Sequence, residues 1–219
     1  MKMPEVNVAR KLSHPHIVTL KDVILEERKL HLVFELMDSN VQKMINMKST
    51  DLHVEGRIKL ILYDALKGIK ALHDHDTFHA NLKPSHLFIK EDNGKVLIGG
   101  LSDSKNYPKF YRAPEILLGS TMINSKCDIF SLGLIFSHLL INRPLISGVD
   151  NKAQLTQMCA LFGTPKESNW PEAYDLALEM EYRFPIDYQK ATGILVDPVN
   201  LSKTMTETTE EAIDLIYKM

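Results

Sequence analysis

The sequence has few cysteines and no long apolar run. Cys127 and Cys159 are its two cysteines, and neither belongs to a metal-type spacing. Such sparse usage is typical of a reducing, intracellular compartment. The longest apolar run, residues 130–141, is well short of the ~20 residues that a membrane span needs. The N-terminus lacks the apolar segment of a secretory signal. These features predict an intracellular protein without a membrane span, in which residues 130–141 form a buried core helix.

The sequence also lacks a large excess of charge of either sign. Lys and Arg number 26 against 28 for Asp and Glu, so the net charge is −2. This balance gives no electrostatic reason to expect nucleic acid or an anionic membrane as a partner. The hydrophobic fraction of 44% and charged fraction of 25% are typical of a globular domain. Evidence for function must therefore come from local motifs.

Residue patterns predict an α+β fold that is mostly helical. A helix is expected at residues 5–13, followed by two strands, 16–25 and 29–37, joined by a polar turn at 26–29. Apolar residues at helical spacing predict an amphipathic helix over 54–72. The remaining expectations are strands at 88–89 and 95–98 around a turn at 91–94, helices at 114–118, 125–141, 152–161 and 209–219, and irregular structure at 162–197.

Three ordered motifs resemble the eukaryotic protein kinase domain from its C-helix onward. Residues 78–88, FHANLKPSHLF, match its catalytic loop, with residues 79–81 (H-A-N) in the places of H-R-D. Residues 113–115 read A-P-E, and Asp128 with Gly133 fits the D-x-W-S-x-G helix. The resemblance implies a kinase fold.

A finer resemblance is to the CMGC group of kinases. Residues 160–185 carry its G-T-P and W-P-x-x-Y pattern, and the hinge-like residues 34–45 are similar to the male germ cell-associated, intestinal-cell and MOK-type branch, especially MOK. Glu35 and Met37 take the hinge positions.

This resemblance implies an N-lobe remnant at residues 1–37 and a C-lobe at 38–219, both truncated. The Gly-rich loop and strand lysine would precede Met1, and Glu5 takes the place of the C-helix glutamate. The arginine that normally pairs with Glu115 would lie beyond Met219.

The resemblance also shows which catalytic positions are altered. Asn81 stands where the base aspartate belongs, and an amide has no useful basicity. His86 replaces an asparagine that binds magnesium, which prefers oxygen. Lys83 keeps the place of the lysine that neutralises the transferring phosphate. The DFG aspartate falls at Gly99, or at Ile98 in the other register, and neither can bind magnesium. Asp103 could substitute only through a shift of four or five residues.

The phosphorylation switch is altered as well. Ala80 replaces the arginine that pairs with an activation-loop phosphate, and the segment between Leu101 and Ala113 lacks the T-x-Y motif of this branch. Asp128 is expected to hydrogen-bond the catalytic-loop backbone.

A cluster of histidines and aspartates, HDHDTFH, raises the alternative of a metal site. Its residues are His73, Asp74, His75, Asp76 and His79. Their alternation sends successive side chains in different directions, and no tetrahedral set with typical spacing is visible. A solvated helix end is the favoured interpretation, and no metal site is predicted.

The sequence therefore predicts a pseudokinase of the CMGC serine/threonine kinase family, with a binding or scaffold role for a protein partner and no cofactor. The alternative is an active kinase that uses ATP and Mg²⁺ on protein hydroxyls. A third interpretation is a non-functional truncated product, because an open hairpin would leave apolar surface exposed. The resemblance implies the cytoplasm, nucleus or cilium as its location, and no oligomeric state is predicted.

Overall fold

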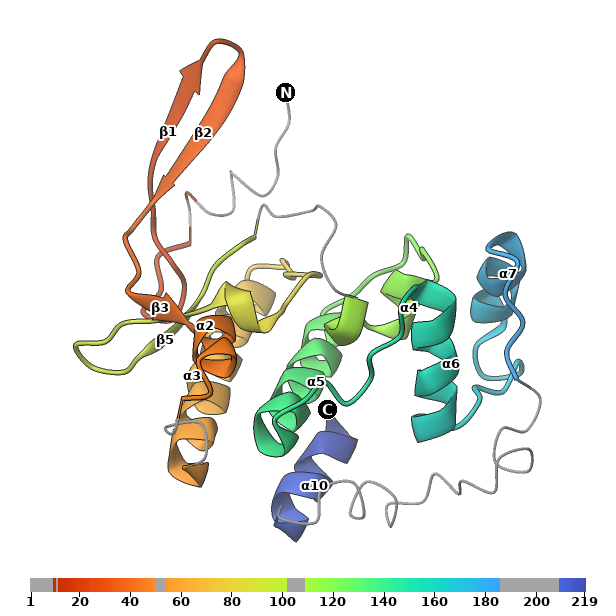
Figure 1. Ribbon diagram of the computed structural model, residues 1–219. Coiled ribbons are helices and arrows are strands. Elements are labelled where there is room, and N and C mark those ends of the chain that lie inside the picture. The colour runs from red at the N-terminus through yellow and green to blue at the C-terminus, as the bar shows by residue number, and fades with distance from the viewer. Residues whose placement is uncertain (1–9, 11, 50–53, 102–108, 186–208) are drawn as a thin grey trace. The chain divides into compact units, whose positions relative to one another are not determined.

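The computed structural model describes most of the chain in two compact units (Figure 1). These are Met1–Lys105 (unit 1) and Asn106–Met219 (unit 2). The described residues are 10, 12–49, 54–101, 109–185 and 209–219. The helix expected at residues 5–13 lies mostly outside them. The lobe boundary expected after residue 37 rests on the kinase resemblance, and it stays a prediction.

Unit 1 contains the expected antiparallel hairpin, formed by β1 (Leu20–Glu26) and β2 (Lys29–Phe34) (Figure 1). The connection is the expected turn at 26–29, with Glu27 and Arg28 as its two central residues, whose φ values are 46° and 63°. The last residue of β1 pairs with the first of β2, and their opposite charges favour this pair. Positive φ at both central residues is typical of a type I′ turn.

A second, three-stranded antiparallel sheet has the order β3 (Ser39–Asn40), β4 (Leu87–Ile89) and β5 (Val96–Ile98). All three residues of β5 are buried, which explains its continuous apolar sequence. The strands expected on either side of the turn at 91–94 are therefore confirmed. Asn40 also caps α2 (Val41–Asn46) with its side-chain oxygen.

The amphipathic helix expected at 54–72 is α3 (Glu55–His73), and it packs against β5. Gly68 allows this close approach. An added Cβ there would lie 2.6 Å from the backbone oxygen of His16 and 2.8 Å from Cδ1 of Ile98. The buried hydrophobic residues of α3 are Ile58, Ile61, Leu62, Ala65, Ile69, Ala71 and Leu72.

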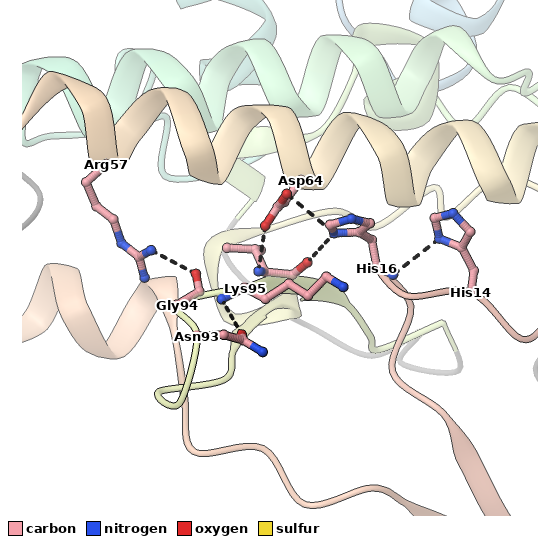
Figure 2. A network of polar contacts seen from close by, with 8 residues as sticks. His14, His16, Arg57, Asp64, Asn93, Gly94 and Lys95 are labelled. Carbon is pink, nitrogen blue, oxygen red and sulfur yellow. Dashed lines mark hydrogen bonds and ion pairs between the residues drawn. The ribbon is translucent and has the colours of Figure 1, made fainter.

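Polar contacts also attach β5 and its turn to α3 (Figure 2). The Val96 amide donates to Oδ2 of Asp64 at 3.0 Å. Nδ1 of His16 donates to the Val96 carbonyl at 3.0 Å and lies 3.6 Å from Oδ1 of Asp64. Nη1 of Arg57 donates to the carbonyl of Gly94 in the turn at 2.8 Å. These contacts fix the position of β5 on α3. They therefore also fix the position of Gly99 and Gly100, which follow β5.

Every regular element that the structure describes in unit 2 is a helix. The side chain of Thr209 accepts the Ala212 amide and caps the N-terminus of the last helix. The helix that carries residues 130–141 is buried along most of its length, which confirms the expected core helix. Cys127 and Cys159 are both buried in helices, and they do not form a disulfide. The elements are η3 (Lys109–Tyr111), α4 (Pro114–Leu117), α5 (Lys126–Ile141), α6 (Asn151–Phe162), α7 (Pro171–Glu179) and α10 (Glu210–Lys218).

Helix α7 corrects one expectation, because it lies within the stretch 162–197 that was expected to be irregular. Pro171 is at its first turn, where a missing N–H costs nothing. Ala173 and Ala177, one helical turn apart, are buried. The proline thus begins a helix here, and the expectation is wrong for residues 171–179.

The expected fold class is confirmed, since small sheets accompany a mostly helical chain. Among the described residues, no helix combines the length and apolar character required to cross a membrane.

Candidate functional site

The catalytic-loop segment, residues 78–88, runs from the turn after α3 into β4 and contains the short helix η2 (Pro84–His86). Two hydrogen bonds connect residues within this segment. The His86 amide donates to the carbonyl of Lys83, and Nδ1 of the same histidine lies 2.9 Å from the carbonyl of Asn81. Because a carbonyl oxygen only accepts, Nδ1 must carry the proton. The His86 side chain therefore braces the loop.

His79 and His86 are stacked and buried, with ring centroids 5.1 Å apart and planes at 21°. Nε2 of His79 donates to the carbonyl of Gly99 at 2.9 Å. The Gly99 amide in turn donates to the carbonyl of His86 at 3.0 Å. These contacts join the catalytic-loop segment to the residues that follow β5.

The backbone at Gly99 and Gly100 lies too close to neighbouring side chains to accept a side chain of its own. A Cβ on Gly99 would lie 2.8 Å from the ring of Phe88 and 3.0 Å from Val18. A Cβ on Gly100, where φ is +79°, would lie 2.5 Å from the ring of His86. Unstrained carbon contacts require about 3.5–4.0 Å. Neighbouring side chains therefore occupy the space that a side chain at either glycine would need.

Ile98 is the other position at which the resemblance could place the metal-binding aspartate. It is fully buried in β5, and its side chain lies against α3 at Gly68. Its amide donates to the carbonyl of His16, and its carbonyl accepts from Val18. A side chain here points into the core of unit 1. Asp103, the remaining candidate, lies outside the described residues.

The other loop positions differ in exposure. Lys83 is buried, with 6% of its surface exposed, whereas Asn81 and Ala80 are partly exposed. Ala80 has a φ of +58°, in the left-handed region where a residue with a side chain is strained.

The two hinge positions lie between β2 and β3. Glu35 accepts the Thr19 amide at 2.8 Å with Oε1 and the Lys90 ammonium at 2.9 Å with Oε2. Burial alone would raise the pKa of the Glu35 carboxyl, but the hydrogen bonds from Lys90 and Thr19 outweigh it and hold the pKa below its usual value. Met37 is partly exposed, next to the exposed Leu36. The Glu35 side chain thus joins β1 to the end of β4.

Two predicted structural residues lie in unit 2. Asp128 is fully buried in α5, and burial raises the pKa of Glu115 in α4. The expected hydrogen bond from Asp128 to the catalytic-loop backbone would connect the two units, and it stays a prediction.

The histidine and aspartate cluster forms the predicted helix end and turn, with its members engaged separately. Asp74 accepts from Lys70 at 2.7 Å, and Nδ1 of His75 donates to the carbonyl of Ala71 at 2.8 Å. Within the described part of the chain, no three His, Cys, Asp or Glu side chains are grouped so that they could hold a metal ion.

Comparison with known proteins identifies the family. The protein kinase domain family matches residues 2–219. The chain belongs to this family. It is 33% identical to human (Homo sapiens) serine/threonine-protein kinase MAK over 100% of its length, and 33% identical to mouse (Mus musculus) serine/threonine-protein kinase ICK over 99%. It is 32% identical to cyclin-dependent kinase F-3 of Oryza sativa subsp. japonica over 100%. The resemblance to the CMGC kinases MAK and ICK is thereby confirmed.

The chain covers only part of these relatives. It spans 35% of the human MAK protein, 34% of the mouse ICK protein and 50% of cyclin-dependent kinase F-3.

In this kinase domain, the described residues do not fit magnesium at the two family positions. At the first, His86 offers a ring nitrogen in place of oxygen, and its Nδ1 proton is directed to Asn81. At the second, neither Gly99 nor Ile98 carries a carboxylate, and no space remains for one at Gly99. The base position, Asn81, carries an amide. The site therefore keeps the loop of a kinase without its oxygen ligands.

The structure brings Asn81, His86 and Gly99 together through hydrogen bonds, and their assignment to a kinase site stays a prediction. Sequence reasoning did not include Gly100 and Phe88, which contact the same residues. The ring of His86 lies against Gly100, and the ring of Phe88 lies against Gly99. One signal was present. A glycine pair directly after a buried strand indicates that another part of the chain approaches the backbone closely.

Proposed function

We propose that this chain is a catalytically inactive member of the CMGC serine/threonine kinase family, with a binding or scaffold role for a protein partner. One observation carries the proposal. At Gly99, the ring of Phe88 and the side chain of Val18 occupy the space that a side chain would need, and at Ile98 the side chain points into the core of unit 1. The packing therefore leaves no space for the metal-binding carboxylate at the position where the resemblance places it.

The chemistry of the remaining loop residues supports the same proposal. Phosphoryl transfer is catalysed mainly by positioning and charge stabilisation. Replacing the base by Asn81 removes a contribution of about 10²–10⁴ in rate. Lys83 alone supplies positive charge at the phosphate-neutralising position, and one cation does not replace two metal ions.

The proposal is tested by nucleotide binding and phosphotransfer on the full chain. Thermal-shift titrations with ATP, with and without Mg²⁺, are expected to show no magnesium-dependent rise in Tm. Incubation with γ-labelled ATP and a generic protein acceptor is expected to leave the acceptor unlabelled. Lys83→Met is the matched control, because a contaminating kinase would give the same signal with either protein.

Two alternatives give different outcomes in these assays. Magnesium-dependent binding with phosphotransfer that Lys83→Met abolishes would establish an active, ATP-dependent kinase and overturn the proposal. A non-cooperative melt with strong binding of a hydrophobic dye would favour a non-functional product. A cooperative melt without phosphotransfer would support the pseudokinase proposal.

We also propose an intracellular location, in the cytoplasm, nucleus or cilium, following the branch resemblance. The scarcity of cysteine supports a reducing compartment. Imaging of the tagged full chain tests this, and secretion into the medium would contradict it. The finer likeness to MOK stays a prediction.

A further inference from the structure

Unit 2 contains an apolar cavity of about 310 Å³, and no residue of the catalytic-loop segment lines it. Helices α4, α5 and α6 contribute to the cavity, together with the connection after α6, Trp170 and Phe184. Eleven residues line it, and none of them is charged. Burying an ion without a partner costs several kcal/mol. The lining therefore selects against charged ligands.

Aromatic side chains in two groups build much of the wall. Phe130 and Phe162 are in edge contact, with centroids 6.0 Å apart and planes at 69°. Phe184 lies 5.3 Å from Tyr182 at 78° and 4.9 Å from Tyr174. Edge contacts of this kind hold rings in preferred orientations. The rings thus support one another without filling the cavity.

The polar groups at the border already have partners within unit 2. The Thr164 hydroxyl donates to the carbonyl of Pro185 at 2.8 Å, and the Tyr174 hydroxyl donates to that of Pro165 at 2.7 Å. The amide of Gly163, directly after α6, donates to the carbonyl of Cys159 at 2.9 Å. Burial also raises the pKa of the Cys159 thiol, which favours its neutral form. A ligand would therefore meet an uncharged, mainly apolar surface.

We propose that this cavity is a binding site for a small neutral ligand with an aromatic or short aliphatic body. Apolar cavities of about 150 Å³ bind benzene, so this cavity, about twice as large, accommodates one or two rings. Its volume is at the lower limit for small-molecule sites, which begin at about 300 Å³. A peptide segment would bring backbone polar groups that this lining cannot satisfy.

Toluene and benzoate test the proposal because they share a carbon skeleton and differ in charge. Trp170 is the only tryptophan of the chain and lines the cavity, so its fluorescence reports on binding directly. Toluene is expected to change the fluorescence saturably and to raise Tm by mass action. Benzoate is expected to bind at least about tenfold more weakly, because its charge must be desolvated.

A cavity-filling variant distinguishes this site from weak surface binding. Cys159→Leu adds carbon atoms inside the cavity and is expected to weaken toluene binding about tenfold. Val149→Leu adds similar bulk at a position that is 94% exposed, and it should leave binding unchanged. If Cys159→Leu does not fold, Phe162→Ala replaces it, because this side chain is 43% exposed and removing it takes away one wall.

Three results would overturn the proposal. These are no saturable effect of toluene on the wild-type protein, equal binding of benzoate, or full toluene affinity in the cavity variant that folds, Cys159→Leu or its replacement Phe162→Ala. Dimerisation that buries Trp170 and prevents toluene binding would likewise assign the cavity to a second copy of the chain. None of these results bears on phosphotransfer, so the pseudokinase proposal is tested separately.

Discussion

The catalytic-loop segment of unit 1 and the aromatic cavity of unit 2 both place rings beside glycines, and they differ in how much space remains. In unit 1, the ring of His86 would lie 2.5 Å from a Cβ on Gly100. In unit 2, a Cβ on Gly163, which lines the cavity, would meet nothing within 4 Å. The catalytic-loop motif therefore surrounds a filled position, whereas the G-T-P segment of unit 2, residues 163–165, borders an open cavity. The space that the packing leaves, rather than the motif, decides what each region can accept.

The largest expected effect comes from adding one methyl group to the filled position. Gly100→Ala should lower the free energy of unfolding by about 3 kcal/mol, because the left-handed strain adds to a clash with His86. Gly119→Ala in unit 2 has the same φ of +79° and open space around its Cβ, so it should cost only about 1 kcal/mol. Denaturant unfolding measures both.

A double variant shows whether the clash is the cause. Combining Gly100→Ala with His86→Ala should reduce the cost of the glycine substitution to that of Gly119→Ala. Equal costs for the two single glycine substitutions would show that the contact with His86 is not tight.

A smaller effect is expected from acidification, through the buried pair Tyr111 and His138 of unit 2. The Tyr111 hydroxyl lies 2.7 Å from Nδ1 of His138, and burial lowers the pKa of this histidine below its ordinary value of 6.5. The unfolded chain therefore binds the proton more tightly. Stability should be complete above about pH 6.5 and fall by about 1 kcal/mol per pH unit below it, until the folded pKa is reached.

Unfolding followed by Trp170 fluorescence between about pH 7.5 and pH 5.5 measures this loss. His138→Phe should lessen the dependence on pH, whereas His31→Gln, at an exposed position of β2, should leave it unchanged. A pH dependence that survives His138→Phe in full would assign the effect to another group.

The smallest effect on stability is expected from glycine substitutions at residues of the two units whose backbone has a left-handed conformation. Ala80→Gly should raise the free energy of unfolding by about 1 kcal/mol, because glycine adopts its φ of +58° without strain. Asn142→Gly, at the end of α5 with a φ of 53°, should gain only a few tenths, since asparagine tolerates this region. Equal gains in denaturant unfolding would show that Ala80 is not specially strained.

Much of the fold could be predicted because its signals are local. The period of apolar residues placed α3, and a continuous apolar run placed α5. Local rules failed where one signal has two meanings. Pro171 lies in the stretch 162–197 that was expected to be irregular, although it begins α7.

The candidate site was predictable in its chemistry but not in its packing. The kinase resemblance implies that Asn81 stands at the base position and His86 at a metal-ligand position, and the chemistry of both residue types is visible in the sequence. The proton on Nδ1 of His86 and the stacking on His79 required coordinates, because both depend on the folded loop.

The sequence by itself determined that Asn81 cannot act as a base, because an amide has no useful basicity in any conformation. It also determined the positions of α3 and α5, because the period and the length of their apolar runs are local. Only the tertiary structure decided that Gly99 has no room for a carboxylate, and that residues from α4 to Phe184 line an uncharged cavity. Both properties depend on distances between residues far apart in the chain, which no local pattern encodes.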